Sequence, residues 1–213
     1  HIHNTLSAYR EGNREMKRRM VLASKSPRRR ELLEMLGAQF EVITSDCDEN
    51  ITGLAPRDLV RELALRKAEA VYERQNDPDA VVIGSDTIVT PDGVKALGKP
   101  RDRGDAVRTL TELSGKWHSV CTGIAVIGRA ADNTSKKIAE TVETKVKFLD
   151  LTKEECERYA DTGEPLDKAG SYGIQGRGGA LVEKIDGDYY SVVGLPVSRL
   201  RVILRDEFGI NLL

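Results

Sequence analysis

The sequence predicts an α/β protein in which helices cover a central β-sheet. From Met20 onward, short apolar runs rich in β-branched residues alternate with longer stretches of helical periodicity. Apolar residues make up 39% of the 213 residues, enough for one sizeable core or for two lobes that face a cleft. No stretch is long and apolar enough to span a membrane, so we expect no membrane partner.

The first two elements are predicted from their end signals. Met20 to Ala23 is a short apolar run typical of a buried strand. Ser26 is a favourable N-cap, Pro27 suits the first helical position, and Gly37 ends the helix after Leu36. We therefore expect a strand that leads almost directly into a helix.

The ends of the remaining elements are predicted from three kinds of signal: prolines at helix starts, glycine and aspartate at turns, and one capping box. The first half contains a strand at Phe40–Ile43, an acidic loop at Thr44–Leu54, a helix at Ala55–Gln75 opened by Pro56, and a strand at Ala80–Val89 followed by a Pro91-Asp92-Gly93 turn. The middle contains a helix at Asp102–Leu113 and β-rich segments at Lys116–Ile127 and Ala139–Phe148, joined by a loop around Asn133. The last part contains a helix from Thr152 to Thr162 with Glu155 in its capping box, a glycine-rich region at Gly163–Gly187, a hairpin-like turn at Asp186-Gly187-Asp188, and a last helix from Pro196 to Phe208.

The composition excludes several kinds of chemistry. Lysines and arginines number 33 against 34 acidic residues, so the net charge of −1 gives no overall field for nucleic acid, and we expect no such partner. The three cysteines are far apart in the sequence, which argues against a disulfide framework and favours a reducing, cytoplasmic location. His118 is the only internal histidine, so a histidine triad has almost nothing to build with. Carboxylates, lysines and arginines remain, and they suit phosphoryl or nucleotidyl chemistry assisted by a hard cation such as Mg2+.

Residues 1–19 differ from the rest because they are polar, charged and without the apolar segment of a signal peptide. We interpret them as a flexible or loosely helical arm in front of one domain, residues 20–213. The basic cluster Lys17-Arg18-Arg19 could contact nucleic acid, but a short charge run is more often a solvated tail.

Three arginines stand in the first turn of the predicted helix that begins at Pro27. Arg28, Arg29 and Arg30 face the positive end of the helix dipole, which costs up to about 1 kcal/mol unless an anion is bound there. Free helix N–H groups, the hydroxyls of Ser24 and Ser26, and guanidinium groups together describe a phosphate site. The alternative is that the arginines merely solvate a surface helix.

Asp86 lies in the apolar run Val81–Val89, which is typical of a strand buried on both faces. An ionised carboxylate there costs several kcal/mol unless a metal ion or a lysine compensates it, roughly as for other buried charges. The alternative is an edge strand with Asp86 facing water. Lys67 falls within the apolar stripe of the Ala55–Gln75 helix, where it could pair with Asp86, bind phosphate, or extend to solvent from the border of the stripe.

Two further stretches carry candidate residues. Asp48 and Glu49 lie in the acidic loop, where one of them could join Asp86 in holding a metal, although acidic loops are common on surfaces. Gly93 to Pro100 nearly matches a P-loop, but Pro100 replaces the magnesium-binding hydroxyl, so we reject a P-loop and keep Lys99 as a point charge for phosphate.

The segment Asp167–Gly179 holds five glycines, which allow a backbone to approach a ligand closely. Gln175 offers both a donor and an acceptor suited to a base edge. A plain flexible loop is the alternative, although Tyr172 and Ile174 make the segment look folded.

Four motifs together resemble the Maf family of nucleoside triphosphate pyrophosphatases, also called septum formation inhibitor-like proteins. They are Ser24-Lys25-Ser26-Pro27-Arg28-Arg29, Gly84-Ser85-Asp86-Thr87, Lys99-Pro100 and the run from Asp167 to Gly176. The resemblance covers nearly everything after Met20. It implies a two-lobed α/β fold on a bent mixed sheet with a nucleotide-binding cleft, similar to the inosine triphosphate pyrophosphatase fold.

The resemblance also implies an activity, namely hydrolysis of a nucleoside triphosphate to the monophosphate and pyrophosphate with a divalent cation, Mg2+ or Mn2+. Asp86 matches the family's proton acceptor, and Glu49, Lys67 and Lys99 match its other charged cleft residues. Arg28, Thr87 and Gln175 match the positions that distinguish the dTTP/UTP branch. The candidates are thus Asp86, Lys67 and Lys99 for catalysis, Ser24, Ser26, Arg28, Arg29, Thr87, Lys168 and Gln175 for the substrate, and Glu49 with Asp86 for the metal.

The mechanistic hypothesis is metal-assisted attack of water on the α-phosphorus, with Asp86 as general base. Two other functions stay open: a pyrophosphatase that removes noncanonical purine nucleotides, and a non-catalytic nucleotide sensor that regulates cell division. Modified pyrimidine nucleotides are also open as substrates, and the oligomeric state is open between a monomer and a homodimer.

Overall fold

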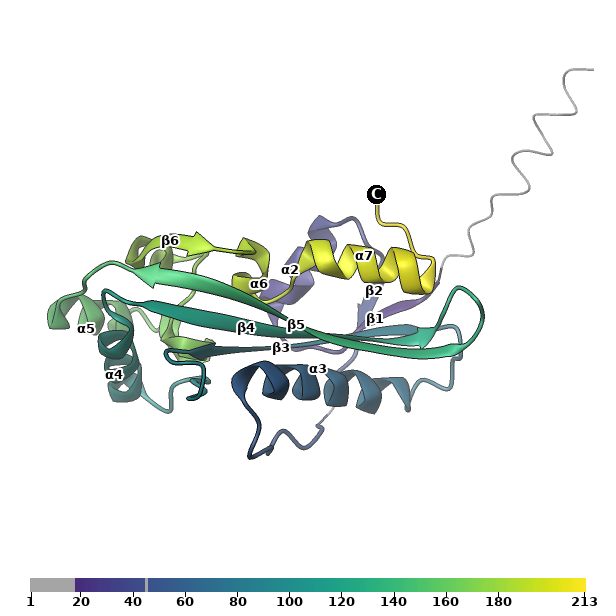
Figure 1. Cartoon of the computed structure of the whole chain (residues 1–213), viewed down its shortest axis with the longest axis horizontal. Helices are drawn as coiled ribbons and strands as arrows, with labels where there is room; N and C mark the ends of the chain where they lie inside the picture. Colours follow the sequence, from purple (N-terminus) through teal and green to yellow (C-terminus); the bar gives the residue numbers. More distant parts are fainter. Residues whose placement is uncertain (1–17, 45) are drawn as a thin grey trace, which may run out of the picture.

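The structure, a computed structural model, describes residues 18–44 and 46–213 and is built on one mixed sheet (Figure 1). The six strands lie in the order β2-β1-β3-β4-β5-β6. Their bounds are β1 Met20–Leu22, β2 Phe40–Val42, β3 Val81–Thr90, β4 Trp117–Arg129, β5 Ser135–Phe148 and β6 Val182–Asp186. β1 pairs in parallel with β2 and β3, and the other pairs are antiparallel. This sheet confirms the predicted α/β class.

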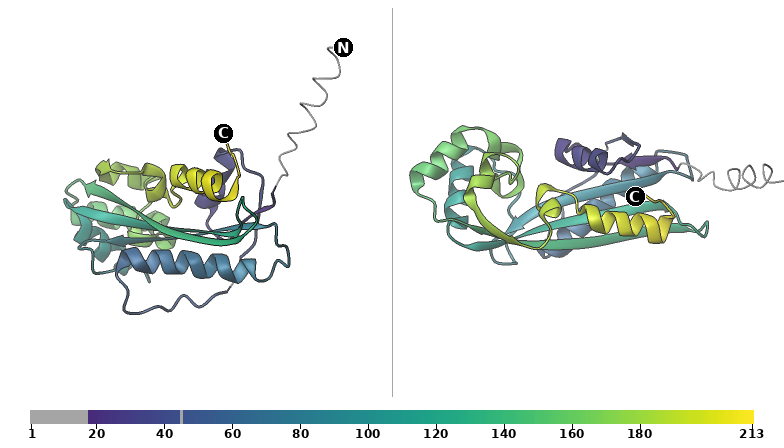
Figure 2. Two further views of the ribbon diagram at one scale, coloured as in Figure 1. Left: turned by 45° about the vertical axis from the view of Figure 1, so that its right-hand side comes forward. Right: turned by 90° about the horizontal axis from the view of Figure 1, so that it is seen from above.

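The helices form two groups along the three long central strands. Their bounds are α2 Pro27–Met35, α3 Pro56–Tyr72, α4 Arg103–Leu113, α5 Lys153–Asp161, α6 Tyr189–Val193 and α7 Val197–Phe208, with short 3-10 helices η1 Glu164–Asp167, η2 Ala169–Ser171 and η3 Arg177–Leu181. At one end of the sheet α3 covers one face while α2 and α7 cover the other; α4, α5 and β6 lie at the opposite end (Figures 1 and 2). The long strands bend between the two groups, so the predicted two-lobed arrangement on a shared sheet is confirmed.

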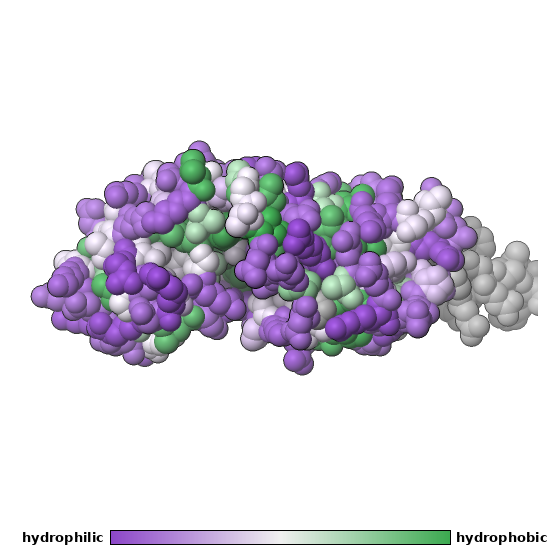
Figure 3. All heavy atoms as spheres, turned by 90° about the horizontal axis from the view of Figure 1, so that it is seen from below, coloured by the Kyte–Doolittle hydropathy of each residue, from purple (hydrophilic) through white to green (hydrophobic). Residues whose placement is uncertain are grey.

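Each lobe has its own apolar core. Leu33 of α2 and Leu200 of α7 belong to the cluster of the first lobe, whereas Leu110 of α4 and Phe148 of β5 belong to the cluster of the second. Ile174, from the glycine-rich segment, packs against both clusters. The glycine-rich segment is therefore fixed at the junction of the lobes, where the surface seen from below is indented (Figure 3).

Two glycines let α3 lie unusually close to the sheet. A Cβ atom at Gly84 of β3 would collide with the carbonyl oxygen of Ala64, and one at Gly123 of β4 would collide with that of Val60. Gly123 is the register partner of Asp86. Because the helix axis approaches the strands at these positions, a side chain of α3 can reach Asp86 directly.

The turn at Asp186-Gly187-Asp188 corrects one prediction, because it is not a hairpin. It connects β6 to α6, and Asp188 caps that helix by accepting the N–H of Tyr190 at 2.9 Å. The N-cap ability of aspartate therefore outweighed the turn signal of Asp-Gly. The last helix also begins at Val197, with Pro196 as its N-cap residue.

The predicted arm lies mostly outside the described residues, which begin at Arg18. Arg18 donates to the carbonyl of Phe208 at 3.0 Å, and Arg19 pairs with Glu41 at 2.7 Å. Among residues 18–44 and 46–213, the structure has no helix with the length and apolarity needed to cross a membrane.

His118 is buried in the core of the second lobe. Its Nε2 lies 2.7 Å from the hydroxyl of Tyr172, and its ring makes edge-on contacts with Phe148 and Tyr172. Burial lowers the pKa of His118 from 6.5 to about 4, so the ring is neutral in the folded protein at neutral pH.

This burial predicts a pH-dependent stability. The unfolded chain protonates His118 near its ordinary pKa of 6.5 and the folded chain only near 4, so the unfolded state binds more protons between these values. The free energy of unfolding should therefore fall as the pH falls from 6.5 to 4, by up to about 3 kcal/mol. The variant His118→Gln cannot titrate in this range, so its free energy of unfolding should fall correspondingly less. Urea unfolding of both proteins across this pH range measures the difference. Parallel curves for the two proteins would contradict the prediction.

Candidate active site

The start of α2 has the predicted cap. Ser26 Oγ accepts the N–H of Arg29 at 3.3 Å, Pro27 occupies the first helical position, and the first turn contains no acidic residue. Ser24 Oγ accepts the N–H of Ser26 at 3.2 Å, so both serines shape the connection from β1. The free N–H groups of this helix end therefore keep their positive potential.

Arg29 is held by the protein itself. Its Nε donates to the carbonyl of Gly194 at 2.7 Å, Nη2 donates to Thr87 Oγ1 at 2.9 Å, and Nη1 lies 3.4 Å from Ser24 Oγ. Burial lowers the pKa of the guanidinium to about 10, partly offset by the charge of Asp86. The predicted phosphate ligand Arg29 thus ties α2 to β3 and to the segment between α6 and α7.

Arg28 reaches the other lobe instead. Its Nη1 lies 3.8 Å from Asp167 Oδ2, and Lys168 Nζ lies 2.9 Å from the other oxygen of the same carboxylate. Lys168 also donates to the carbonyl of Glu164 at 2.9 Å. The structure therefore brings two predicted substrate ligands, Arg28 and Lys168, together around one exposed carboxylate.

Asp86 and Lys67 form the predicted ion pair. Lys67 Nζ donates to Asp86 Oδ1 at 2.8 Å and lies 3.1 Å from Glu49 Oε1. The side chains of Lys67 and Asp86 are 20% and 18% exposed, whereas Glu49 is 57% exposed. One ammonium group thus bridges both carboxylates that the sequence assigned to the metal.

The strand around Asp86 differs from the expectation of burial on both faces. Val81 to Ser85 is buried, but Asp86 and Thr87 are partly exposed. The reason is that β1 ends at Leu22, whose register partner is Ile83, so β3 has no strand neighbour on that side between Ile83 and Val89, where Leu97 pairs with it. β3 is therefore a central strand at its start and an open edge at Asp86.

Thr87 lies on the opposite face of β3 from Asp86, because side chains alternate along a strand. Its hydroxyl accepts from Arg29 and lies 3.0 Å from Thr122 Oγ1 of β4. The open edge consequently presents a carboxylate–lysine pair on the α3 side and a hydroxyl–guanidinium pair on the α2 side.

Lys99 and Gln175 are not in contact with these groups. Both are exposed, and neither makes a hydrogen bond or ion pair with another candidate in the described part of the chain. The backbone around Lys99 is nevertheless fixed, since Leu97 pairs with Val89 and the carbonyl of Gly98 accepts from Gly170. The structure confirms that the stretch is no P-loop, because no helix begins at Lys99 and the next helix, α4, begins only at Arg103.

Sequence reasoning missed Glu164, which organises the glycine-rich segment. Its Oε1 accepts from the Tyr159 hydroxyl at 2.7 Å and from the N–H of Gly178 at 3.0 Å, and Oε2 accepts from the N–H of Arg177 at 3.0 Å. The Tyr159 hydroxyl in turn accepts from Gly173 at 3.0 Å. The position after Gly163 gave no periodic signal that could have revealed this role.

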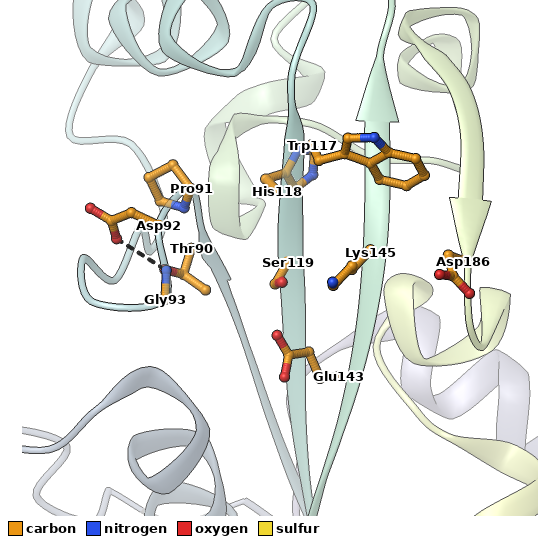
Figure 4. A pocket seen from close by; sticks show the side chains of 10 residues that line it. All are labelled: Thr90, Pro91, Asp92, Gly93, Trp117, His118, Ser119, Glu143, Lys145 and Asp186. Atoms are coloured by element: carbon orange, nitrogen blue, oxygen red, sulfur yellow. Dashed lines mark hydrogen bonds between the residues drawn. The ribbon is translucent and has the colours of Figure 1, made fainter.

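A pocket of about 570 Å³ lies away from these residues, on the open face of β3, β4 and β5 (Figure 4). Trp117, Ser119, Glu143 and Lys145 line it, and Lys184 Nζ lies 5.5 Å above the Trp117 ring. None of its lining residues belongs to the candidate set. It is separate from the site at the edge of β3.

The protein is thus of the α/β class, with an arginine-bearing helix start beside a carboxylate–lysine pair at the end of a parallel strand, a geometry that favours anions such as phosphate. The sequence pattern of the family described as "Maf-like protein" matches residues 19–207, and the chain belongs to this family.

Curated relatives match over most of their length. The chain is 50% identical to a dTTP/UTP pyrophosphatase of Alkaliphilus oremlandii, covering 92% of this chain and 100% of the relative. It is also 50% identical to one of Bacillus anthracis, covering 86% and 92%. Among solved structures, the Staphylococcus aureus Ham1 protein has a TM-score of 0.41 at 19% identity, covering 60% of this chain and 71% of that one.

The contacts of Arg29 predict a difference between neighbouring arginines. Arg29→Lys keeps the charge, but a lysine cannot donate hydrogen bonds to Gly194, Thr87 and Ser24 together. The free energy of unfolding should therefore fall by about 2 kcal/mol. Arg30, which pairs with Glu34 on the surface, is the matched control, and Arg30→Lys should stay within about 0.5 kcal/mol of wild type. Urea unfolding compares them; equal losses would contradict a bracing role for Arg29.

Proposed function

We propose that the protein hydrolyses dTTP and UTP to the nucleoside monophosphate and pyrophosphate. The observation that carries the proposal is the partly buried Asp86–Lys67 pair at the open edge of β3, beside the arginine-bearing start of α2. The names of relatives that are 50% identical over most of the chain support these two substrates. Modified pyrimidine nucleotides remain further candidates.

Asp86 is the general base in this proposal. Lys67 Nζ donates to Oδ1 at 2.8 Å, and Oδ2 makes no hydrogen bond within the described residues. Oδ2 can therefore accept a proton from a water that attacks the α-phosphorus. The bond from that phosphorus to the bridging oxygen breaks, and pyrophosphate leaves with both electrons of the bond.

Positive groups on both sides of the edge bind the polyphosphate. The N–H groups at the start of α2, the hydroxyls of Ser24 and Ser26 and the guanidinium of Arg28 come from one lobe, and Lys168 comes from the other. Lys99 and Gln175 are exposed and free to turn toward a bound nucleotide. Fixed charges that face the developing negative charge supply much of the rate in such reactions.

A divalent cation fits the acidic residues of the site. Mg2+ is usually bound by one or two carboxylates together with substrate phosphates and water. Glu49 and Asp86 offer two carboxylates around Lys67, and no group of three or more His, Cys, Asp or Glu side chains in the described ranges could hold a metal alone. When bound, Mg2+ or Mn2+ would neutralise charge on the triphosphate.

A cytoplasmic location is part of the proposal, supported by three free thiols at Cys47, Cys121 and Cys156. The oligomeric state is left open between a monomer and a homodimer, and light scattering would distinguish them.

A panel of nucleotides tests the proposed activity. With Mg2+ or Mn2+, the protein should convert dTTP and UTP to equimolar monophosphate and pyrophosphate faster than it converts purine nucleotides. Asp86→Asn should lower kcat by about 10²- to 10⁴-fold because the base is lost, while circular dichroism shows a retained fold. Asp58→Asn, on the exposed first turn of α3, is the matched control and should keep wild-type kcat.

The outcomes separate the alternatives. Faster turnover of noncanonical purine nucleotides would favour the purine pyrophosphatase, and tight binding of dTTP without product would favour the sensor. Wild-type turnover by Asp86→Asn would show that another group is the base.

Removing the exposed carboxylate tests the metal site. Glu49→Gln should raise the Mg2+ concentration needed for half-maximal activity by about tenfold, since one charged ligand is lost, with less effect on kcat at saturating Mg2+. Glu73→Gln, exposed at the end of α3, is the control. An unchanged Mg2+ dependence would exclude Glu49 as a ligand.

A further inference from the structure

A line of three hydrogen bonds runs inward from the open edge of β3. Arg29 Nη2 donates to Thr87 Oγ1 at 2.9 Å, Thr87 Oγ1 lies 3.0 Å from Thr122 Oγ1, and Thr122 Oγ1 donates to the carbonyl of Ser191 at 2.7 Å. Thr87 is partly exposed, whereas Thr122 and Ser191 are fully buried. The line therefore begins where a ligand can reach it and ends in the core.

The chemistry of the end groups fixes the direction of every hydrogen bond. A carbonyl oxygen only accepts, so the single hydroxyl hydrogen of Thr122 points to Ser191. Thr122 must then accept from Thr87, whose single hydrogen is used in this bond. A guanidinium only donates, so Arg29 occupies one of the two acceptor positions of Thr87. Thr87 retains one acceptor position and no donor.

The buried end of the line is held in place by a second set of bonds. Ser191 Oγ donates to the carbonyl of Asp188 at 2.9 Å and lies 3.0 Å from Thr144 Oγ1. Thr144 Oγ1 also accepts from the N–H of Asp188 at 3.0 Å. Because these bonds anchor the first turn of α6 on β5, the Ser191 carbonyl cannot turn away and release Thr122.

We propose that Thr122 is a specificity-determining residue that keeps Thr87 a pure hydrogen-bond acceptor, so that the site selects a pyrimidine carrying an N–H donor at ring position 3. This inference rests on the proposed function. Thymine and uracil have N–H at that position, whereas cytosine has a bare nitrogen that only accepts. Thr87 consequently pairs with thymine or uracil and opposes cytosine, two acceptors being placed face to face.

The ratio of kcat/KM for dTTP to that for dCTP measures this selection. Thr122→Val has a similar shape but cannot accept a hydrogen bond, so the Thr87 hydrogen becomes free to serve cytosine. We expect the ratio to fall at least about tenfold in Thr122→Val. Thr122→Ser, which restores the hydroxyl, should return to within about threefold of wild type.

Thr141→Val is the matched control, because the Thr141 hydroxyl also donates to a carbonyl, that of Arg57, on the α3 side of the sheet. Its ratio should equal that of wild type. If Thr122→Val lowers both rates equally, or keeps the wild-type ratio, Thr122 is only structural and the proposal is overturned. A Thr122→Ser variant whose dTTP-to-dCTP ratio of kcat/KM falls as far as that of Thr122→Val would overturn it too.

A neutron structure of the deuterium-exchanged protein checks the direction without any substrate. Deuterium on Thr87 Oγ1 should point to Thr122, and deuterium on Thr122 Oγ1 to Ser191; the reverse orientation would overturn the proposal even in an active enzyme. A wild-type protein that hydrolyses no pyrimidine triphosphate would instead contradict the proposed function, so the two failures are distinguishable.

Discussion

The early end of β1 is the constraint on which the site depends. β1 stops at Leu22 because Ser24, Ser26 and Pro27 turn the chain into α2, so β3 loses its parallel neighbour beyond Ile83. The same three residues place a helix N-terminus at the end of a parallel strand, a geometry that favours anions. One local signal therefore creates both the open edge that exposes Asp86 and the positive helix end beside it.

Side chains alternate along β3, so Asp86 and Thr87 lie on opposite faces of the sheet. Asp86 points toward α3, where Gly84 and Gly123 let the helix approach closely enough for Lys67 to reach the carboxylate. Thr87 points the other way, toward Arg29. In the proposed function, Asp86 accepts a proton on one face of the strand and Thr87 recognises the ligand on the other, and the open strand edge lets one ligand contact both.

Local signals were enough for the elements and for part of the site. The Ser26 cap, the capping box of Thr152 and Glu155, and the inward position of Lys67 were all readable from spacing. The contacts of Arg29 with Gly194 and of Thr122 with Ser191 were not, because they join residues 165 and 69 positions apart. Periodicity assigns a side chain to a face, but it cannot say which distant carbonyl that face meets.

The three arginines of α2 also show how an apparent electrostatic conflict is resolved. Arg29 is satisfied by carbonyl and hydroxyl oxygens, and Arg30 pairs with Glu34 one turn along. Only Arg28 relies on a partner from the other lobe, Asp167, at 3.8 Å and with side chains 27% and 65% exposed. An exposed pair of this kind is worth at most about 1 kcal/mol, so a triphosphate at the helix end can take Arg28 from Asp167 at little cost. Of the three arginines, Arg28 is therefore the one that a bound anion can recruit, and the anion would replace a contact between the two lobes.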